Sequence, residues 1–243
     1  MGNQTGIEWT ERTWNPWMGC TKVSPGCAHC YMFRERERYG KDPSVVVRSK
    51  TTFTAPLRWK RGAGSGLVFT CSWSDWFHEG ADAWRDEAWA IIRATPHLTY
   101  QILTKRPERI VEHLPADWGD GWPNVWLGVS VENQRFAGRA SRLATIPATV
   151  RFISAEPLLG PVHLPLDGIH WVIVGGESGS EARPMELHWA RTIRDECAEA
   201  GVAFFLKQLG GPRNPRAHDL AILDGQRHTA IPARRALADV REG

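Results

Sequence analysis

Three cysteines lie within eleven residues near the N-terminus, at positions 20, 27 and 30 of the segment Cys-Thr-Lys-Val-Ser-Pro-Gly-Cys-Ala-His-Cys. The other two cysteines, Cys71 and Cys197, stand alone far along the chain. Three thiolates are one ligand short of a structural zinc site, which is tetrahedral. They can hold three irons of a 4Fe–4S cube and leave the fourth iron open to another ligand. The spacing of Cys20, Cys27 and Cys30 therefore predicts an iron–sulfur centre with an open iron.

The residues around these cysteines resemble the cluster loop of radical S-adenosylmethionine (SAM) proteins. Asn-Pro-Trp-Met-Gly-Cys at residues 15–20, followed by Cys-Ala-His-Cys-Tyr at residues 27–31, is most similar to spore-photoproduct-lyase-like members. The gap between Cys20 and Cys27 is longer than in the commonest radical SAM spacing. A cube tolerates such a difference, because it fixes only the three sulfur positions and the backbone between them can bulge.

Further segments extend the resemblance over roughly residues 6–211. Together they are similar to a phage-associated, radical-SAM-like family with a three-cysteine motif and no assigned substrate. The resemblance implies a 4Fe–4S cluster on the three cysteines, SAM on the open iron, and an electron donor such as flavodoxin or ferredoxin. The matching segments are residues 6–10, 13–17, 74–79, 101–109, 126–133, 154–161 and 174–179.

Short apolar, β-rich runs recur along the chain, with helical stretches between many of them. Continuous rather than alternating apolarity favours strands buried on both faces, as in a parallel sheet covered by helices. Repeated strand–helix units predict an α/β fold with a parallel (β/α) barrel, full or partly open and TIM-like. The expected strands are residues 45–48, 67–70, 100–103, 125–129, 150–154, 171–174 and 203–206, with another at 7–10 before the cysteines.

Apolar residues at helical spacing predict several of the helices. The stripe over residues 187–200 ends at Gly201, a typical helix terminator, and places Cys197 in the core as a structural thiol. Pro107 fits the first turn of a helix that runs to about residue 114, and residues 136–143 mark another. We expect residues 1–211 to form the barrel domain and residues 212–243 to form a C-terminal tail packed on it.

Polar residues follow strand after strand of the expected barrel. The carboxyl ends of parallel barrel strands meet on one face, where active sites are built, and the cysteine loop, residues 20–30, would open onto the same face. Ser and Thr at these positions have a second interpretation as helix N-caps. Glu132, Glu156 and Glu177 are harder to explain in that way, because three neighbouring carboxylates repel one another unless a cationic group lies between them.

We assign the strand-end residues to two roles. Asp75, His78 and Lys105 are the predicted catalytic residues, with His78 the candidate for proton transfer. The sequence Gly-Gly-Glu at residues 175–177 resembles the one that helps to hold the SAM amino group in many radical SAM enzymes, although it follows a later strand here. Cys71 is either a packed thiol or part of the site. The predicted cofactor-binding residues are Ser130, Glu132, Ser154, Glu156, Gly175, Gly176 and Glu177.

Composition sets the class of protein. The chain has 243 residues, of which 42% are hydrophobic and 23% charged, an ordinary globular composition. No apolar run approaches the roughly 20 residues of a membrane span, and the N-terminal residues do not form an apolar signal segment. We therefore expect a cytoplasmic protein that binds no membrane and keeps its clustered thiols reduced, as metal ligands.

The net charge of +3 is unevenly distributed along the chain. Residues 1–65 carry eleven basic and five acidic side chains, residues 66–206 carry twelve and eighteen, and residues 207–243 carry seven and four. If both basic ends fold over one face, they frame a site for a nucleic acid or a nucleotide. The alternative is a set of solvated surface charges. The basic residues expected nearest the iron are Lys22, Arg34, Arg38 and Lys207.

Two hypotheses of function follow. In the first, the resemblance implies a radical-SAM-type enzyme that cleaves SAM and abstracts hydrogen from a substrate. In the second, the three cysteines hold a cluster, or bind zinc together with His29 or another side chain. The protein would then be a phage protein that binds nucleic acid or a host protein without turnover. The polar residues at the strand ends favour the enzyme, because a binding module does not need them.

Overall fold

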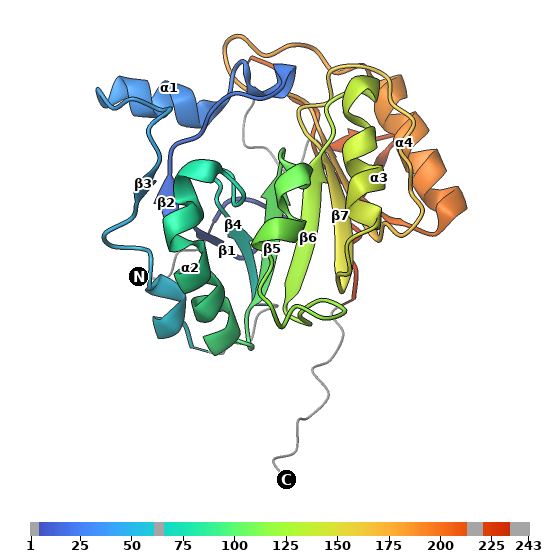
Figure 1. The fold of residues 1–243 in the computed structure, drawn as a ribbon. Helices are drawn as coiled ribbons and strands as arrows, with labels where there is room; N and C mark the ends of the chain where they lie inside the picture. The colour runs from blue at the N-terminus through green and yellow to red at the C-terminus, as the bar shows by residue number, and fades with distance from the viewer. Residues whose placement is uncertain (1–4, 61–65, 213–220, 234–243) are drawn as a thin grey trace.

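The computed structural model describes residues 5–60, 66–212 and 221–233 (Figure 1). Within these ranges seven strands form one sheet, and every neighbouring pair is parallel. In spatial order the strands are β1 (Arg12–Trp14), β4 (Leu67–Thr70), β5 (Thr99–Thr104), β6 (Val125–Ser130), β7 (Val150–Ala155), β8 (Trp171–Gly175) and β9 (Ala203–Gln208).

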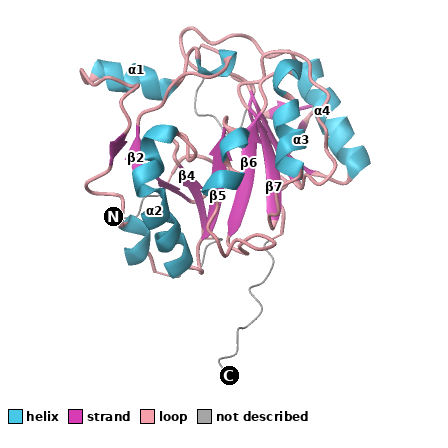
Figure 2. Cartoon of the chain, in the orientation of Figure 1, coloured by secondary structure: helices cyan, strands magenta, loops and turns pink. Residues whose placement is uncertain are grey.

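The sheet curls into an open half-barrel (Figures 1 and 2). Helices α2 (Asp82–Ala94), α3 (Gly138–Ala144) and α4 (Leu187–Ala200) contribute buried residues to the same core and so cover one face of the sheet. No ladder joins β1 to β9 among the described residues, so the barrel stays open there. The α/β class and the partly open parallel barrel are therefore confirmed. No helix in the described ranges is long and apolar enough to cross a membrane.

The two faces of the sheet carry different cores. Side chains alternate between the faces along a strand. One set, which includes Val68, Ile102 and Leu127, packs with the helices. The other set lines the inner face of the half-barrel and is mostly aromatic. This inner core contains Trp9, Phe69, Trp126, Phe152, Trp171 and Phe205, and it forms a floor below the carboxyl ends of the strands.

Six of the expected strands lie in the sheet close to their predicted bounds, and two expectations were wrong. Only Val47–Arg48 of residues 45–48 is a strand, β3, which pairs antiparallel with β2 (Trp17–Met18) outside the main sheet. Residues 7–10 form a turn, and the first strand of the sheet is β1. Their apolar residues instead pack on the inner core, where Trp9 contacts Phe69 at a ring distance of 4.7 Å.

The predicted helix ending at Gly201 is confirmed as α4, and Gly201 is left-handed with a φ of 68°. The predicted helix from Pro107 is wrong. That segment forms two short 3-10 turns, Pro107–Arg109 and Val111–His113, which bury Pro107 and Ile110 and expose Val111. The remaining helix of the described chain, α1 (Tyr31–Arg38), directly follows Cys30.

The described part of the C-terminal tail packs along β9. Strands β10 (Ile222–Leu223) and β11 (Gln226–Arg227) form a hairpin, and the chain then runs beside the sheet edge. The Leu206 amide donates to the His228 carbonyl at 2.8 Å, and the Ala230 amide to the Phe204 carbonyl at 3.2 Å. Residues 213–220 and 234–243 of the predicted tail lie outside the described residues.

Candidate functional site

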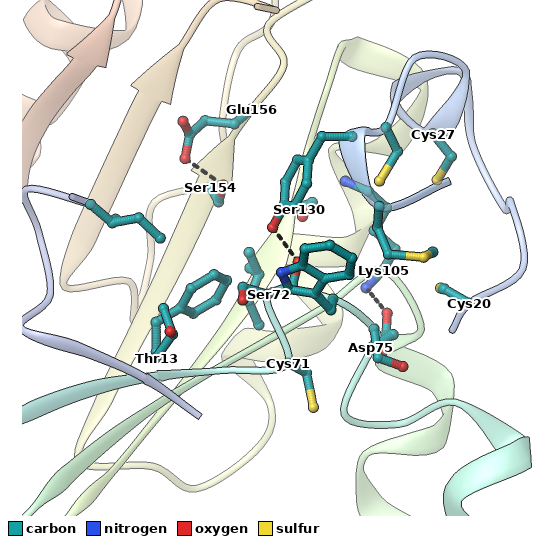
Figure 3. Close-up of a pocket in the computed structure, with 18 of the residues that line it drawn as sticks. Thr13, Cys20, Cys27, Cys71, Ser72, Asp75, Lys105, Ser130, Ser154 and Glu156 are labelled. Atoms are coloured by element: carbon teal, nitrogen blue, oxygen red, sulfur yellow. Dashed lines mark hydrogen bonds between the residues drawn. The ribbon is translucent and has the colours of Figure 1, made fainter. Parts of the chain in front are cut away.

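A cavity of about 1050 Å³ lies at the carboxyl ends of the strands (Figure 3). Side-chain alternation explains its polar lining. On the inner face, the apolar Leu103, Phe152 and Phe205 are each followed two residues later by a polar side chain, namely Lys105, Ser154 and Lys207. Residues 5–9 and part of α1 close the open side. The cavity contains eight of the predicted site residues, namely Cys20, Cys27, Cys30, Asp75, Lys105, Ser130, Ser154 and Glu156, and also Cys71.

The residues before Cys20 fix the start of the cysteine loop. The Asn15 side chain donates to Ser72 Oγ at 3.0 Å and accepts from the Trp73 amide at 2.9 Å. The buried Trp17 indole donates to the Asp75 carbonyl at 3.2 Å. Both side chains therefore tie the segment before Cys20 to the loop after β4. This explains why an Asn-Pro-Trp sequence precedes the first cysteine.

Gly19 allows the close approach that places Cys20. It has a φ of +107°, and a Cβ at this position would collide with the Val45 carbonyl oxygen. We therefore expect Gly19→Ala to destabilise the fold by at least about 1 kcal/mol, or roughly 2–4 °C in Tm. Thermal unfolding of Gly40→Ala is the matched control, because Gly40 has a φ of +64° but open space around it. Equal losses in both variants would show that the contact with Val45 contributes nothing.

Glu132 holds the middle of the cysteine loop. Its carboxylate is fully buried, lies 2.8 Å from Lys105 Nζ and 3.0 Å from Arg139 Nη1, and accepts from Ser24 Oγ at 2.5 Å. Gly26 packs on this side chain so closely that an added Cβ would lie 2.5 Å from Glu132 Cγ. Burial opposes ionisation, but Lys105 and its other partners lower the pKa of Glu132, so the group is a carboxylate.

Glu177 holds the far end of the loop in the same way. Arg183 donates to it from Nε at 2.8 Å and from Nη2 at 2.6 Å, and His29 Nδ1 lies 3.0 Å away. Arg183 Nη2 also donates to the Pro25 carbonyl at 3.0 Å. Although burial works against ionisation, the Arg183 hydrogen bonds lower the pKa of Glu177 to about 2. Among the described residues, the cavity lining includes neither Glu177 nor Glu132.

Asp75 and Arg106 form a third anchor, at the first cysteine. Asp75 accepts from Thr104 Oγ1 at 2.6 Å and lies 3.3 Å from Arg106 Nη1. Arg106 donates to Thr21 Oγ1 at 2.7 Å and lies 3.7 Å from Cys20 Sγ. Burial, followed by the Asp75 charge, raises the pKa of Cys20 to about 12, so its free thiol is protonated and must lose that proton to bind a metal.

His78 lies behind the loop and is absent from the cavity lining in the described residues. Its Nδ1 accepts from the Gly80 amide at 3.0 Å, so Nε2 carries the proton and donates to Thr21 Oγ1 at 3.1 Å. Burial, helped by Arg106, lowers the pKa of His78 and keeps the ring neutral. The structure therefore places His78 as a support for Thr21.

Gly175 and Gly176 make room for neighbouring protein atoms. A Cβ at Gly175 would lie 2.6 Å from Glu156 Oε1, and a Cβ at Gly176 would collide with the Leu209 carbonyl oxygen. Neither glycine lines the cavity in the described chain. The structure therefore accounts for both glycines by the packing of neighbouring parts of the chain.

Glu156 lies across the cavity from Cys20 and Cys27, beside Ser154 (Figure 3). Ser154 Oγ donates to its Oε2 at 3.2 Å. Lys207 Nζ lies 2.9 Å from Oε1 but is not aligned for a hydrogen bond, so this buried oxygen receives none. The cavity therefore presents an ion pair opposite the cysteines.

In the described part of the chain, no three His, Cys, Asp or Glu side chains gather as they would around a single metal ion. The three thiols line one cavity from one loop. Burial is the main cause of the raised pKa of Cys20 and of Cys30, and the charge of Cys27 also raises both.

Fold and site define an α/β protein with an open parallel half-barrel and a cysteine-lined cavity at its carboxyl edge. The chain belongs to the family described as "Protein of unknown function (DUF5131)", whose family model matches residues 4–232. Comparisons with curated proteins and with solved structures gave no match. The function must therefore be argued from the site.

Proposed function

We propose that this protein is a radical-SAM-type iron–sulfur enzyme and that its sheet is an open form of a TIM-like barrel. The observation that supports this best is the cavity shared by the three cysteines and by polar residues from β5, β6, β7 and β9. Active sites of parallel barrels are built at this edge. Cys20, Cys27 and Cys30 would hold the 4Fe–4S cluster. When bound, the cluster and SAM supply the one-electron chemistry of hydrogen abstraction.

The chain itself contributes a rigid cysteine loop. Arg106 binds it at Thr21, Glu132 at Ser24, and Glu177 at His29. Because all three anchoring side chains are buried, the loop is preorganised in this conformation and the cysteines need not be ordered on metal binding. The aromatic floor closes the cavity from below and excludes water from that side.

The cavity has room for a cofactor and a substrate. It is at the upper end of the roughly 300–1000 Å³ that single small-molecule sites occupy. Ser130, Ser154 and Glu156 are the predicted cofactor-binding residues that line it, and Asp75 and Lys105 are the predicted catalytic ones. The excess of basic residues in segment 1–65 supports a nucleic acid or nucleotide as substrate.

Anaerobic reconstitution with iron, sulfide, reductant and SAM tests this proposal. We expect a brown protein with about four irons per chain, and 5′-deoxyadenosine that forms only when both SAM and reductant are present. A sample without reductant is the control. One zinc per chain, with no iron retained and no 5′-deoxyadenosine, would contradict the enzyme and favour a zinc-stabilised binding protein.

A further inference from the structure

The sulfurs of the three loop cysteines have hydrogen-bond partners of different kinds. Arg106 Nη1 donates to Cys20 Sγ at 3.7 Å. The other two sulfurs have neutral partners: Ser24 Oγ lies 3.7 Å from Cys27 Sγ, and backbone amides at the start of α1 donate to Cys30. Of the described side chains, Arg106 is therefore the one that brings a full charge into hydrogen-bond contact with these sulfurs.

Contacts on both sides fix the guanidinium of Arg106 in this position. The side chain is only 5% exposed, and its Nη1 lies 3.3 Å from Asp75 Oδ2. Its Nη2 donates to the carbonyl oxygen and to the hydroxyl of Thr21, at 3.1 and 2.7 Å. Because Thr21 directly follows Cys20, these bonds keep the guanidinium beside the first cysteine.

Asp75 keeps Arg106 both charged and oriented. Burial opposes the positive charge, but the Asp75 carboxylate, followed by Cys20, raises the pKa of Arg106, so the group is a cation. The carboxylate is itself fixed by the end of β5. Its Oδ1 accepts from Thr104 Oγ1 at 2.6 Å, and its Oδ2 accepts from the Lys105 amide at 2.9 Å. The position of the charge beside Cys20 is therefore built into the sheet.

We propose that Arg106 raises the reduction potential of the iron–sulfur centre by donating a hydrogen bond to Cys20. The inference rests on the proposed function for the centre itself. Reduction adds one electron, and the potential of a cluster depends on the hydrogen bonds to its sulfurs and on the charge around it. A buried cation beside Cys20 attracts the added negative charge and so favours the reduced form. Arg106 acts through Cys20 and is in this sense a positioning residue.

Redox titration of the anaerobically reconstituted protein, followed by the absorbance of the cluster, tests this role. In Arg106→Met we expect the equilibrium constant for one-electron reduction to fall about tenfold, which lowers the midpoint potential by about 59 mV. Arg106→Lys keeps a positive charge beside Asp75 but replaces the guanidinium fork by a single ammonium. It should lower the constant by a smaller factor, about threefold. This variant leaves no buried carboxylate unpaired, so it stays measurable if Arg106→Met does not fold.

Arg183→Met is the matched control. Arg183 also anchors the cysteine loop, through Glu177 and the Pro25 carbonyl, but it donates to no cysteine sulfur in the described ranges. Loss of anchoring alone would affect both loop arginines in the same way, whereas we expect Arg183→Met to change the constant less than twofold. Equal shifts in the two Met variants, or a wild-type potential in both Arg106 variants, would overturn the proposal. Loss of iron from Arg106→Lys would assign Arg106 to holding the loop and would overturn it too.

The proposed function fails on different results. A wild-type protein that retains no iron would refute both proposals. A cluster that titrates with the expected shifts but forms no 5′-deoxyadenosine would contradict the enzyme and support the role of Arg106, because the potential depends on the cluster and not on SAM.

Discussion

Replacing any one of Cys20, Cys27 or Cys30 by serine is expected to reduce the iron retained after anaerobic reconstitution from about four per chain to less than about one. In the proposed cluster each thiolate would hold a separate iron of the cube, so the loss of one would leave an iron without its protein ligand. The three side chains line one cavity from one loop, and no other cysteine belongs to that loop. Iron and sulfide analysis of the soluble, desalted protein measures the effect.

Cys71 and Cys197 provide the matched controls. Cys197 is buried within α4, far from the loop in sequence, and Cys197→Ala should keep the full iron content. Cys71→Ser is the more demanding control, because Cys71 lines the same cavity at the end of β4. A full cluster in any variant of the trio, or its loss in Cys71→Ser alone, would show that the ligand set is wrong.

The strands could be predicted where burial and sequence pattern agree. Six expected strands are continuously apolar because helices cover one of their faces and the aromatic floor lies on the other. Residues 45–48 have the same β-branched composition, yet Val45 and Val47 are exposed. In residues 7–10 the apolar Ile7 and Trp9 pack on the floor without joining a ladder. Composition alone does not separate these cases, since it determines neither burial nor strand pairing.

The gathering of polar residues at one edge was predictable from topology alone. Parallel strands bring their carboxyl ends together, and this placed Asp75, Lys105, Ser130, Ser154 and Glu156 in the cavity with the cysteines. The different roles of the three strand-end glutamates were not predictable from the sequence. Three neighbouring carboxylates required cationic partners, and the structure gives each carboxylate its own: Lys105 and Arg139 for Glu132, Lys207 for Glu156, and Arg183 for Glu177.

The contacts that anchor the cysteine loop were missed for a related reason. Ser24 and Glu132 are 108 residues apart in sequence, and no local pattern connects them. Arg139 and Arg183 lie on a helix and in a loop, where arginine is usually a surface residue. Among these arginines only Arg106 had a signal, because it directly follows Lys105 at the end of β5. A single sequence reveals which residues reach the edge, but not which of them turn outward to hold a distant loop.

Glu132→Gln is expected to cause the largest loss of stability among the changes considered. The substitution keeps the shape of the side chain but leaves Lys105 and Arg139 without their buried counter-charge, which costs about 3–5 kcal/mol. Tm should fall by roughly 10 °C or more. The exposed Glu108 supplies the control variant Glu108→Gln, which should change Tm by no more than about 2 °C.

The pH dependence of this loss tests its electrostatic origin. The pKa of Glu132 is lowered in the folded protein from its ordinary value of 4.5, chiefly by Lys105 acting against burial. Its stabilisation is therefore fully present above pH 4.5 and is lost as the pH falls through the lowered folded-state pKa. The gap in Tm between wild type and Glu132→Gln should be constant near neutral pH and should narrow in acid. The double variant Glu132→Gln/Lys105→Met should recover part of the lost stability, because it removes one of the unpaired charges. A gap that is independent of pH, with no recovery in the double variant, would mean that Glu132 holds the cysteine loop by packing against Gly26 rather than by charge.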